Sequence, residues 1–405
     1  MEDRQLLLPI GPVMASNTKP LEGFLVLDFS QFLAGPMAAM RLGDLGARVI
    51  KIERPPEGDI GRGLAFGGIA ADGDTLSFHI TNRNKQSFAA NLKDQDDLQA
   101  VKKLIEQADV LVQNFRPGVM ERIGLGYDTV RQINPSIVYG SITGYGAEGP
   151  FAKRPGQDLL AQSISGLPWL NGSAEDPPIP VGIALADIIT SIHLAHGITA
   201  ALLKRERIGE GSLVETSLLE SMLDLQFELI SAHLTDPTVT VQRGAKHSAH
   251  AFLQAPYGTY PTADGYIALA MGSVPELGRL IGLTALEDYS DPDTWWSHQG
   301  EITTLLAEHL VTKPTEHWLA LLDEADFWCA PVLTLSELVD HEGFDAIGMS
   351  QEFTRMGTDG TPLTLHSTRA PVRFNRERLT NDQGAPRVGQ HNAEITAELM
   401  GEVDG

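Results

Sequence analysis

A strand–helix–strand pattern near the start of the chain restricts its fold more than any other feature. Phe24–Ser30 (FLVLDFS) is a short apolar run typical of a buried strand. The segment AGPMAAMRLGDLGA after it has helical character, with Pro36 in the first turn, where its missing N–H costs no helical hydrogen bond. Arg48–Pro55 (RVIKIERP) is the next strand. Because strands joined by a helix within about 30 residues pair in parallel, this pattern predicts an α/β fold with a parallel sheet.

The same alternation continues along the first half of the chain. It predicts strands at SFAANL, ADVLVQNF and SIVYGSITGYG, and a helix near Asp96–Gln107. A long apolar helix is expected at Ile188–Arg207, closed by basic residues and Gly209. A second helix is expected at SLVETSLLESMLDLQFELISAHL, residues 212–234. Together these elements predict a large, doubly wound, Rossmann-like domain.

The pattern of residue types changes at Arg243, where small and turn-forming residues are followed by alternating apolar positions, typical of a loop that leads into strands. A chain of 405 residues with 42% hydrophobic side chains has enough apolar material for two cores. We therefore expect the first part of the large domain at 1–225, a linker at 226–248, a small α+β domain at 249–330 and a return to the large domain at 331–405.

Charge and composition argue against several classes of protein. The net charge of −23 disfavours non-specific binding to nucleic acid, because a polyanion repels a polyanion. The sequence has no export signal and no uninterrupted run of about 18 apolar residues, so we expect a cytoplasmic protein without a membrane partner. The single cysteine, Cys329, is interpreted as buried and inert. His193 and His196 share a helix face without further ligands, so no metal site is expected.

A dinucleotide site is a minor alternative for the first strand–helix–strand unit. Glu53 ends the second strand, where the ribose-binding acid of an NAD site would stand. However, the turn before the helix, SQFLAGP, lacks the G-x-G-x-x-G glycines that let a backbone approach a pyrophosphate. Asp28 and Asp44 are interpreted as structural acids.

Five blocks of sequence carry a family resemblance. They are LEGFLVLDFSQFLAGPMAAMRLGDLGARVIKIERPPEGDIGRG, NRNKQSFAANLK, ADVLVQNFRPGVMERIGLGYDTV, NPSIVYGSITGYGAEGPFAKRPGQDLLAQSISGL and APYGTYPTADG. In this order, and over nearly the whole chain, they resemble the class III CoA-transferases (the CaiB/BaiF family, formyl-CoA transferase-like), a family that also contains 2-methylacyl-CoA racemases. The resemblance, and no sequence pattern, implies that two such chains interlock as a homodimer, each threading through the other.

The resemblance also implies that coenzyme A lies against the large domain. The matching positions are Phe32, Leu33, Ala34, Arg54, Ala90, Lys93, Asn114, Arg122 and Ile123. The three basic residues among them would hold the phosphates, and the first three positions would offer backbone contacts to the adenine and pantetheine parts. Asn114 matches a family contact with the thiol arm. The alternative for each basic residue is a solvated surface charge.

In this family the nucleophile is an aspartate after an apolar block, and the matching residue in PVGIALADIITSI is Asp187. The residues alone would favour an ordinary N-cap for an acid at the start of a long helix. The two roles are compatible, because helix N–H groups would keep the carboxylate ionised and oriented. The resemblance implies that Asp187 attacks an acyl-CoA thioester and passes through a mixed anhydride to an aspartyl-CoA thioester.

Asp158, in RPGQD, is the second acid of interest. In the racemases the residue before this aspartate is typically histidine, and the pair shuttles the α-proton of the acyl group. Gln157 stands there in this chain and cannot act as a base, which favours transfer over racemisation. The alternative for Asp158 is a turn residue or an N-cap.

A flexible glycine-rich loop of the small domain covers the site in this family. The corresponding stretch, RGAKHSAHAF (243–252), has one glycine and offers His247, Ser248 and His250. The expected function is transfer of CoA from an acyl-CoA donor, such as a short dicarboxylyl-CoA (succinate, oxalate, malate and mesaconate are common in the family), to a carboxylic acid. Acyl-CoA would be a substrate, with no permanently bound cofactor. A 2-methylacyl-CoA racemase and a non-catalytic CoA- or NAD-binding protein are the alternatives.

Overall fold

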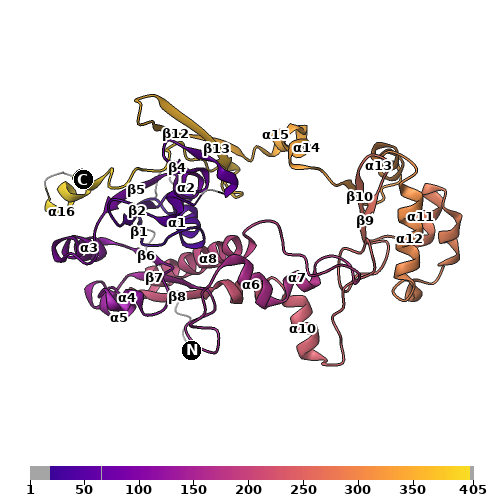
Figure 1. The fold of residues 1–405 in the computed structure, drawn as a ribbon, viewed down its shortest axis with the longest axis horizontal. Coiled ribbons are helices and arrows are strands. Elements are labelled where there is room, and N and C mark those ends of the chain that lie inside the picture. Colours follow the sequence, from indigo (N-terminus) through magenta and orange to yellow (C-terminus); the bar gives the residue numbers. More distant parts are fainter. Residues whose placement is uncertain (1–18, 65, 402–405) are drawn as a thin grey trace, which may run out of the picture. The chain divides into compact units, whose positions relative to one another are not determined.

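The structure, a computed structural model, describes residues 19–64 and 66–401. Its largest sheet has the strand order β5-β2-β1-β6-β7-β8 (Figure 1). These strands are β1 (Leu25–Asp28), β2 (Arg48–Glu53), β5 (Lys85–Ala89), β6 (Val110–Gln113), β7 (Val138–Thr143) and β8 (Ser212–Ser217). Strand β1 pairs in parallel with β2 and β6, β2 pairs in parallel with β5, and β6 with β7. The predicted α/β fold with a parallel sheet is confirmed.

Helices cover both faces of this sheet. One face is covered by α1 (Ala34–Asp44) and α8 (Leu185–Ile208). Both helices pack closely on the sheet: a Cβ added at Gly43 of α1 would lie 3.3 Å from Val49 of β2, and a Cβ added at Gly140 of β7 would lie 2.9 Å from Ile198 of α8. The other face is covered by α3 (Gln95–Gln107), α4 (Val119–Arg122), α5 (Tyr127–Ile133) and α16 (Asn392–Met400). Alternate residues of each strand therefore contribute to different cores.

The strand order reverses between β1 and β6. From β1 the chain adds β2 and β5 on one side, and it then places β6, β7 and β8 on the other side. In open α/β sheets, ligands bind at such a reversal, outside the carboxyl ends of the strands. The segments that follow β1 and β6 are therefore the first place to look for a binding site.

The prediction of one helix over residues 212–234 is wrong at its start. Ser212–Ser217 forms β8, and the helices α9 (Leu218–Asp224) and α10 (Phe227–Thr235) follow it. Side chains along β8 alternate in burial, and the Ser212 N–H donates to the Ile137 carbonyl next to β7. The open edge of the sheet and the β-branched Val214 and Thr216 outweigh the helical pattern here.

The chain divides into two compact units. The first comprises the described residues up to Thr143, Thr190–Thr216 and the chain from Met349 onward, and the second comprises Gly144–Ile189 and Ser217–Gly348. This division places residues 144–189 in the second unit, whereas the sequence pattern predicts that the first part of the large domain runs to residue 225. The expected domain boundaries stay a prediction.

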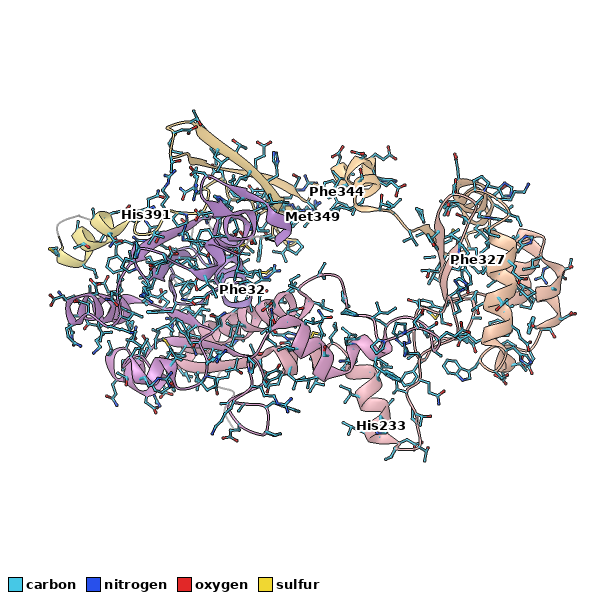
Figure 2. The ribbon with its side chains drawn as sticks, viewed as in Figure 1. Phe32, His233, Phe327, Phe344, Met349 and His391 are labelled. Carbon is cyan, nitrogen blue, oxygen red and sulfur yellow. The ribbon has the colours of Figure 1, made fainter. Side chains whose placement is uncertain are left out.

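The second unit contains an antiparallel sheet of β9 (Gly258–Pro261), β10 (Tyr266–Leu269) and β11 (Cys329–Pro331). Helices α11 (Val274–Ile281), α12 (Gln299–Leu310) and α13 (Thr315–Glu324) share a core with it that includes Tyr260 and Phe327 (Figure 2). Cys329 is only partly buried, which corrects the expected full burial. Burial, followed by the charge of Asp323, raises the pKa of its thiol to about 11, so the thiol stays protonated and unreactive at neutral pH.

The C-terminal part of the chain returns to the first unit. The hairpin of β12 (Ser350–Met356) and β13 (Pro362–Thr368) carries Arg355, which pairs with Asp72 and Asp74 at 2.8 Å each. The remaining elements are β3 (Ala70–Ala71), β4 (Asp74–Thr75), α2 (Leu76–Asn82), α6 (Asp158–Ser165), α7 (Leu167–Leu170), α14 (Leu335–Asp340), α15 (Glu342–Ile347), β14 (Arg373–Phe374), β15 (Glu377–Arg378) and four short 3₁₀ turns, Ile60–Arg62, Phe66–Gly68, Thr284–Asp288 and Pro292–Thr294.

Helix α8 is the one described helix that is long and apolar enough to cross a membrane when judged by length and composition. Half of its most apolar window is buried inside the protein (50%), as in the core helix of a globular domain. Leu194 and Ile198 of this helix are fully buried, and both lie close to Gly140 of β7.

Candidate active site

Asp158 and Asp187 are linked through the start of α8. Asp187 is the third residue of α8, and Asp158 is the first residue of α6. Asp158 Oδ1 accepts hydrogen bonds from the N–H groups of Ala186 (2.7 Å) and Asp187 (3.3 Å). Asp158 thus caps α8, a helix to which it does not belong. The N-cap alternative for Asp187 is wrong, because Asp187 lies inside the first turn and another carboxylate serves the free N–H groups.

The carboxyl group of Asp187 lies in an environment that disfavours its charge. Asp187 is 7% exposed, and its carboxylate accepts no hydrogen bond from the described residues. Burial, and after it the negative charge of Asp158, raises the pKa of Asp187 to about 7. The expectation that helix N–H groups keep this carboxylate ionised is therefore corrected. Asp158 accepts the hydrogen bonds of those N–H groups, and its own negative charge disfavours ionisation of Asp187.

Gln162 organises this pair of acids, although it was not among the expected site residues. It is 1% exposed, its Nε2 donates to Asp158 Oδ2 (2.7 Å), and its Oε1 accepts from the Val181 N–H (3.1 Å). Gln162 therefore holds both Asp158 and the segment that leads into α8. Its position four residues after Asp158, on the same helix face, is the sequence signal that could have found it.

The turn before Asp158 is held by a close approach of two glycines. A Cβ added at Gly156 would lie 2.5 Å from the Cα atom of Gly144, so neither position tolerates a side chain without movement. This contact holds the RPGQD turn against Gly144, the residue that follows the end of β7. Gln157 in this turn is exposed, and its side chain makes no cap hydrogen bond to α6.

The expected CoA-binding residues follow the carboxyl ends of parallel strands. Phe32–Ala34 follow β1, Arg54 follows β2, Ala90 follows β5 and Asn114 follows β6. Since parallel strands end at one edge of a sheet, the topology brings these four segments to the same edge. Ala90 is buried, and its N–H donates to the carbonyl of Glu53 (2.8 Å).

The three basic residues expected to bind phosphate are exposed. Arg54, Lys93 and Arg122 form no ion pair with any residue that the structure describes. Ile123, directly after α4, packs partly buried against the core of the first unit. Arg116, in the same QNFRPG turn as Asn114, is a fourth exposed basic residue, and it was not among the predicted phosphate-binding residues. Cations without carboxylate partners are available to bind phosphate groups.

The turn between β1 and α1 has an unusual backbone. Phe32, labelled in Figure 2, has a φ angle of +70°, in the left-handed region that side chains disfavour. Its N–H donates to Asp59 Oδ1 (3.0 Å). The amide of Asn114 bonds to Gln31 twice, accepting from its N–H (2.8 Å) and donating to its carbonyl (2.7 Å). The expected contact of Asn114 with the thiol arm of CoA stays a prediction.

The surroundings of Glu53 do not fit a dinucleotide site. Glu53 is 3% exposed, its carboxylate pairs with Arg62 at 2.8 Å, and it accepts from Ser87 Oγ at 2.6 Å. A carboxylate used in this way does not present its oxygens to a ribose. The geometry therefore gives no support to the NAD alternative.

The loop RGAKHSAHAF is anchored inside the second unit. The guanidinium of Arg243 lies over the ring of Trp169, 4.5 Å from its centroid. His247 Nδ1 lies 3.1 Å from the carbonyl oxygen of Thr259. Ser248 Oγ is buried and has no hydrogen-bond partner among the residues that the structure describes, and Ser248 lines a pocket of about 410 Å³. A gating role for this loop, carried over from the family, stays a prediction.

Comparisons with known proteins cover nearly the whole chain. The family described as CoA-transferase family III matches residues 21–392. Succinyl-CoA:glutarate CoA-transferase of Mus musculus is 31% identical over 395 residues, which cover 95% of this chain and 87% of the relative. Succinate–glutarate CoA-transferase of Agrobacterium fabrum is 31% identical over 95% of this chain and 97% of its own. The crystal structure of a CaiB/BaiF family protein from Brucella suis is similar with a TM-score of 0.81 and 31% identity, over 94% of this chain and 100% of the other.

Proposed function

Because the chain belongs to CoA-transferase family III, we propose that Asp187 carries the chemistry by which it moves coenzyme A from an acyl-CoA to a carboxylic acid. One observation supports Asp187 above all. Its carboxyl group is buried at the first turn of α8, receives no hydrogen bond from the described residues, and has a pKa raised to about 7. A carboxylate that neither solvent nor donors stabilise is more basic, and hence more nucleophilic, than an ordinary aspartate.

The proposed reaction conserves the activation of the thioester. The Asp187 carboxylate attacks the acyl carbonyl of the donor, the C–S bond breaks, and CoA leaves as a thiolate from a mixed anhydride. The thiolate attacks the aspartyl carbonyl, the donor acid leaves, and an aspartyl-CoA thioester remains. The acceptor carboxylate attacks this thioester to form a second anhydride, and the released thiolate attacks its acceptor acyl group, which frees Asp187. Each step exchanges one activated acyl bond for another, so the chemistry needs neither ATP nor a metal.

Asp158 and Gln162 are proposed to position the nucleophile. Asp158 caps α8 one residue before Asp187, and its charge contributes to the raised pKa of Asp187. Gln157 stands where the racemases have a histidine, and its exposed amide cannot remove a proton from an acyl-CoA. This substitution supports transfer over the 2-methylacyl-CoA racemase alternative.

Acyl-CoA is proposed to bind at the carboxyl edge of the large sheet. Arg54, Lys93 and Arg122 would hold the phosphates, because all three are exposed without ion-pair partners among the described residues. The turn Phe32–Ala34, with Ala90, Asn114 and Ile123, would complete the site. His247 and Ser248 are proposed as further residues that contact substrate.

The substrates are proposed to be short dicarboxylic acids and their CoA thioesters. The relatives from Mus musculus and Agrobacterium fabrum are named for succinate or its CoA thioester and for glutarate. Succinyl-CoA as donor and glutarate as acceptor are therefore the first pair to test. No permanently bound cofactor is part of the proposal.

We also propose that the enzyme works in the cytoplasm as an interlocked homodimer. Large apolar side chains lie exposed on the single chain, among them Leu335 (78%), Leu234 (75%) and Phe227 (61%). A second copy would remove this apolar surface from water. Light scattering should then give twice the mass of one chain.

The decisive experiment tests Asp187 directly. The protein should convert succinyl-CoA and glutarate into glutaryl-CoA, followed by chromatography. With succinyl-CoA alone, mass spectrometry should find CoA attached to the peptide that contains Asp187. Asp187→Asn, whose amide cannot attack the thioester, should lose turnover by about a thousandfold or more and should lose the adduct. Asp96→Asn, which changes an exposed first-turn acid of α3, is the matched control.

Two results would overturn this proposal. One is wild-type turnover in a folded Asp187→Asn protein. The other is deuterium exchange at C2 of a 2-methylacyl-CoA without any transfer of CoA, which would favour the racemase.

A further inference from the structure

Three side chains at the reversal point of the large sheet bond to one short turn. Lys51 Nζ donates to the carbonyl of Ser30 (2.8 Å), and Asp59 Oδ1 accepts from the N–H of Phe32 (3.0 Å). The Asn114 amide makes both of its bonds to the residue between them, Gln31 (2.8 and 2.7 Å). Each residue of the turn Ser30–Phe32 is thus held by a side chain from a different segment.

Two of these side chains form a buried ion pair. Lys51 Nζ lies 2.8 Å from Asp59 Oδ2, and the two residues are 0% and 3% exposed. Asp28 Oδ2 lies 3.7 Å from the same Lys51 Nζ and pairs with Lys85 Nζ at 2.8 Å. Removing these charges from water is costly, and apolar residues of similar size would pack at least as well. Charges retained at this depth therefore point to a role in fixing one conformation of the turn.

The conformation that they fix is a strained one. The φ angle of Phe32 is +70°, and such a backbone persists only where its surroundings over-determine it. The start of α1 adds a further restraint, because a Cβ at Gly35 would lie 2.2 Å from Ser30 Cβ and 3.3 Å from Asn114 Cγ. The strain lies after β1 and next to β6, where the strand order reverses and ligands of such sheets bind.

We propose that Lys51, Asp59 and Asn114 form a turn clamp that shapes the backbone of Gln31–Phe32 for acyl-CoA. In this arrangement Asn114 is a positioning residue that acts through the turn, and it does not act by touching the thiol arm. Its amide oxygen and one of its two N–H groups bond to Gln31, and these two bonds hold the side chain against the turn. This inference rests on the proposed function. It has a consequence that a direct contact lacks: loosening the clamp weakens binding of every part of CoA that lies on the turn, including the nucleotide.

The test compares two ligands and two asparagines. Asn114→Ala should weaken binding of CoA, and of adenosine 3′,5′-bisphosphate, by a similar factor of about ten, measured by titration calorimetry. The bisphosphate is the nucleotide half of CoA and has no thiol arm. Asn134→Ala is the matched control, because Asn134 also bonds to backbone carbonyls, those of Ile105 (2.9 Å) and Ala108 (2.7 Å), before the start of β7. It should lower thermal stability and leave both affinities unchanged.

A second variant keeps the inference testable if Asn114→Ala does not fold. Asp59→Asn retains an oxygen for the Phe32 N–H but loses the charge that faces Lys51. It should weaken both ligands in the same direction by a smaller factor. Loss of CoA binding alone, with the bisphosphate unaffected, would show a direct contact and overturn the inference. Unchanged affinity for both ligands in the variants would also overturn it. A wild-type protein that binds neither ligand would instead refute the proposed function, and the inference with it.

Discussion

The environment of one carboxyl group makes the transfer reaction sensitive to pH near neutrality. Asp187 must be ionised to attack a thioester, and its pKa in the ligand-free protein is raised to about 7. The value of kcat/KM should therefore fall as the pH drops below about 7, because the protonated fraction of Asp187 grows. A profile of kcat/KM between about pH 5 and pH 9 measures this limb.

Asp158→Asn tests the cause of that pKa. The charge of Asp158 is the second contribution to it, after burial, and it raises the pKa of Asp187. Removing this charge should lower the pKa, so activity in the variant should persist to lower pH than in the wild type. A limb that stays at the same pH in Asp158→Asn would contradict the coupling between the two acids.

The residues of the candidate site differ in how far the sequence discloses them. Asp158 could be proposed because it stands in one of the ordered blocks of sequence that resemble a family, and Asp187 because the segment PVGIALADIITSI matches the place of that family's nucleophile. Asp59 could not, since its contact with Phe32 joins positions 27 residues apart and leaves no periodic pattern. The raised pKa of Asp187 could not be predicted from the sequence either, because it depends on which carboxylate accepts hydrogen bonds from the N–H groups at the start of α8.

Among the elements, those with a strong internal pattern were predicted correctly. The unit β1–α1–β2 and the helices α3 and α8 have apolar residues at the spacing that their own structure requires. Strand β8 was mistaken for helix because apolar residues recur throughout residues 212–234 and no glycine or proline marks a boundary between strand and helix. Only the open sheet edge beside β7 selects an extended backbone for the first six residues. Such an edge is non-local, and a window of sequence does not contain it.

The start of α1 provides a prediction at the scale of an element. Gly35→Ala should destabilise the protein by about 1–3 kcal/mol, because a Cβ there would lie 2.2 Å from Ser30 Cβ. The control is Gly300→Ala in α12, where the nearest atom to a new Cβ is Ala245 Cβ at 3.8 Å. This control should be neutral or stabilise by up to about 1 kcal/mol. Denaturant unfolding measures both, and a Gly35→Ala protein as stable as the wild type would contradict the close approach.

For the whole molecule, the sequence predicted two cores but not the path of the chain between them. Residues 144–189 belong with the second unit because of contacts that are distant in sequence. The Ala174 N–H donates to the carbonyl of Gly244, and the Arg243 guanidinium lies over the Trp169 ring. Apolar periodicity carries no information about such polar and stacking contacts, so the sequence pattern alone does not show that residues 144–189 lie in the second unit.

The small domain should fold when residues 244–332 are produced alone. The core around Tyr260, Trp318 and Phe327 lies entirely within this range, and so do β9, β10 and β11 with all of the hydrogen bonds that pair them. A segment with its own core and a complete sheet can form an independent domain. We expect cooperative thermal unfolding by circular dichroism.

A shorter fragment, 244–327, lacks β11 and leaves one edge of β10 unpaired, so it should melt at a lower temperature. If the longer fragment showed no cooperative transition, the small domain would depend on the rest of the second unit, and the expected boundaries near 249 and 330 would be wrong.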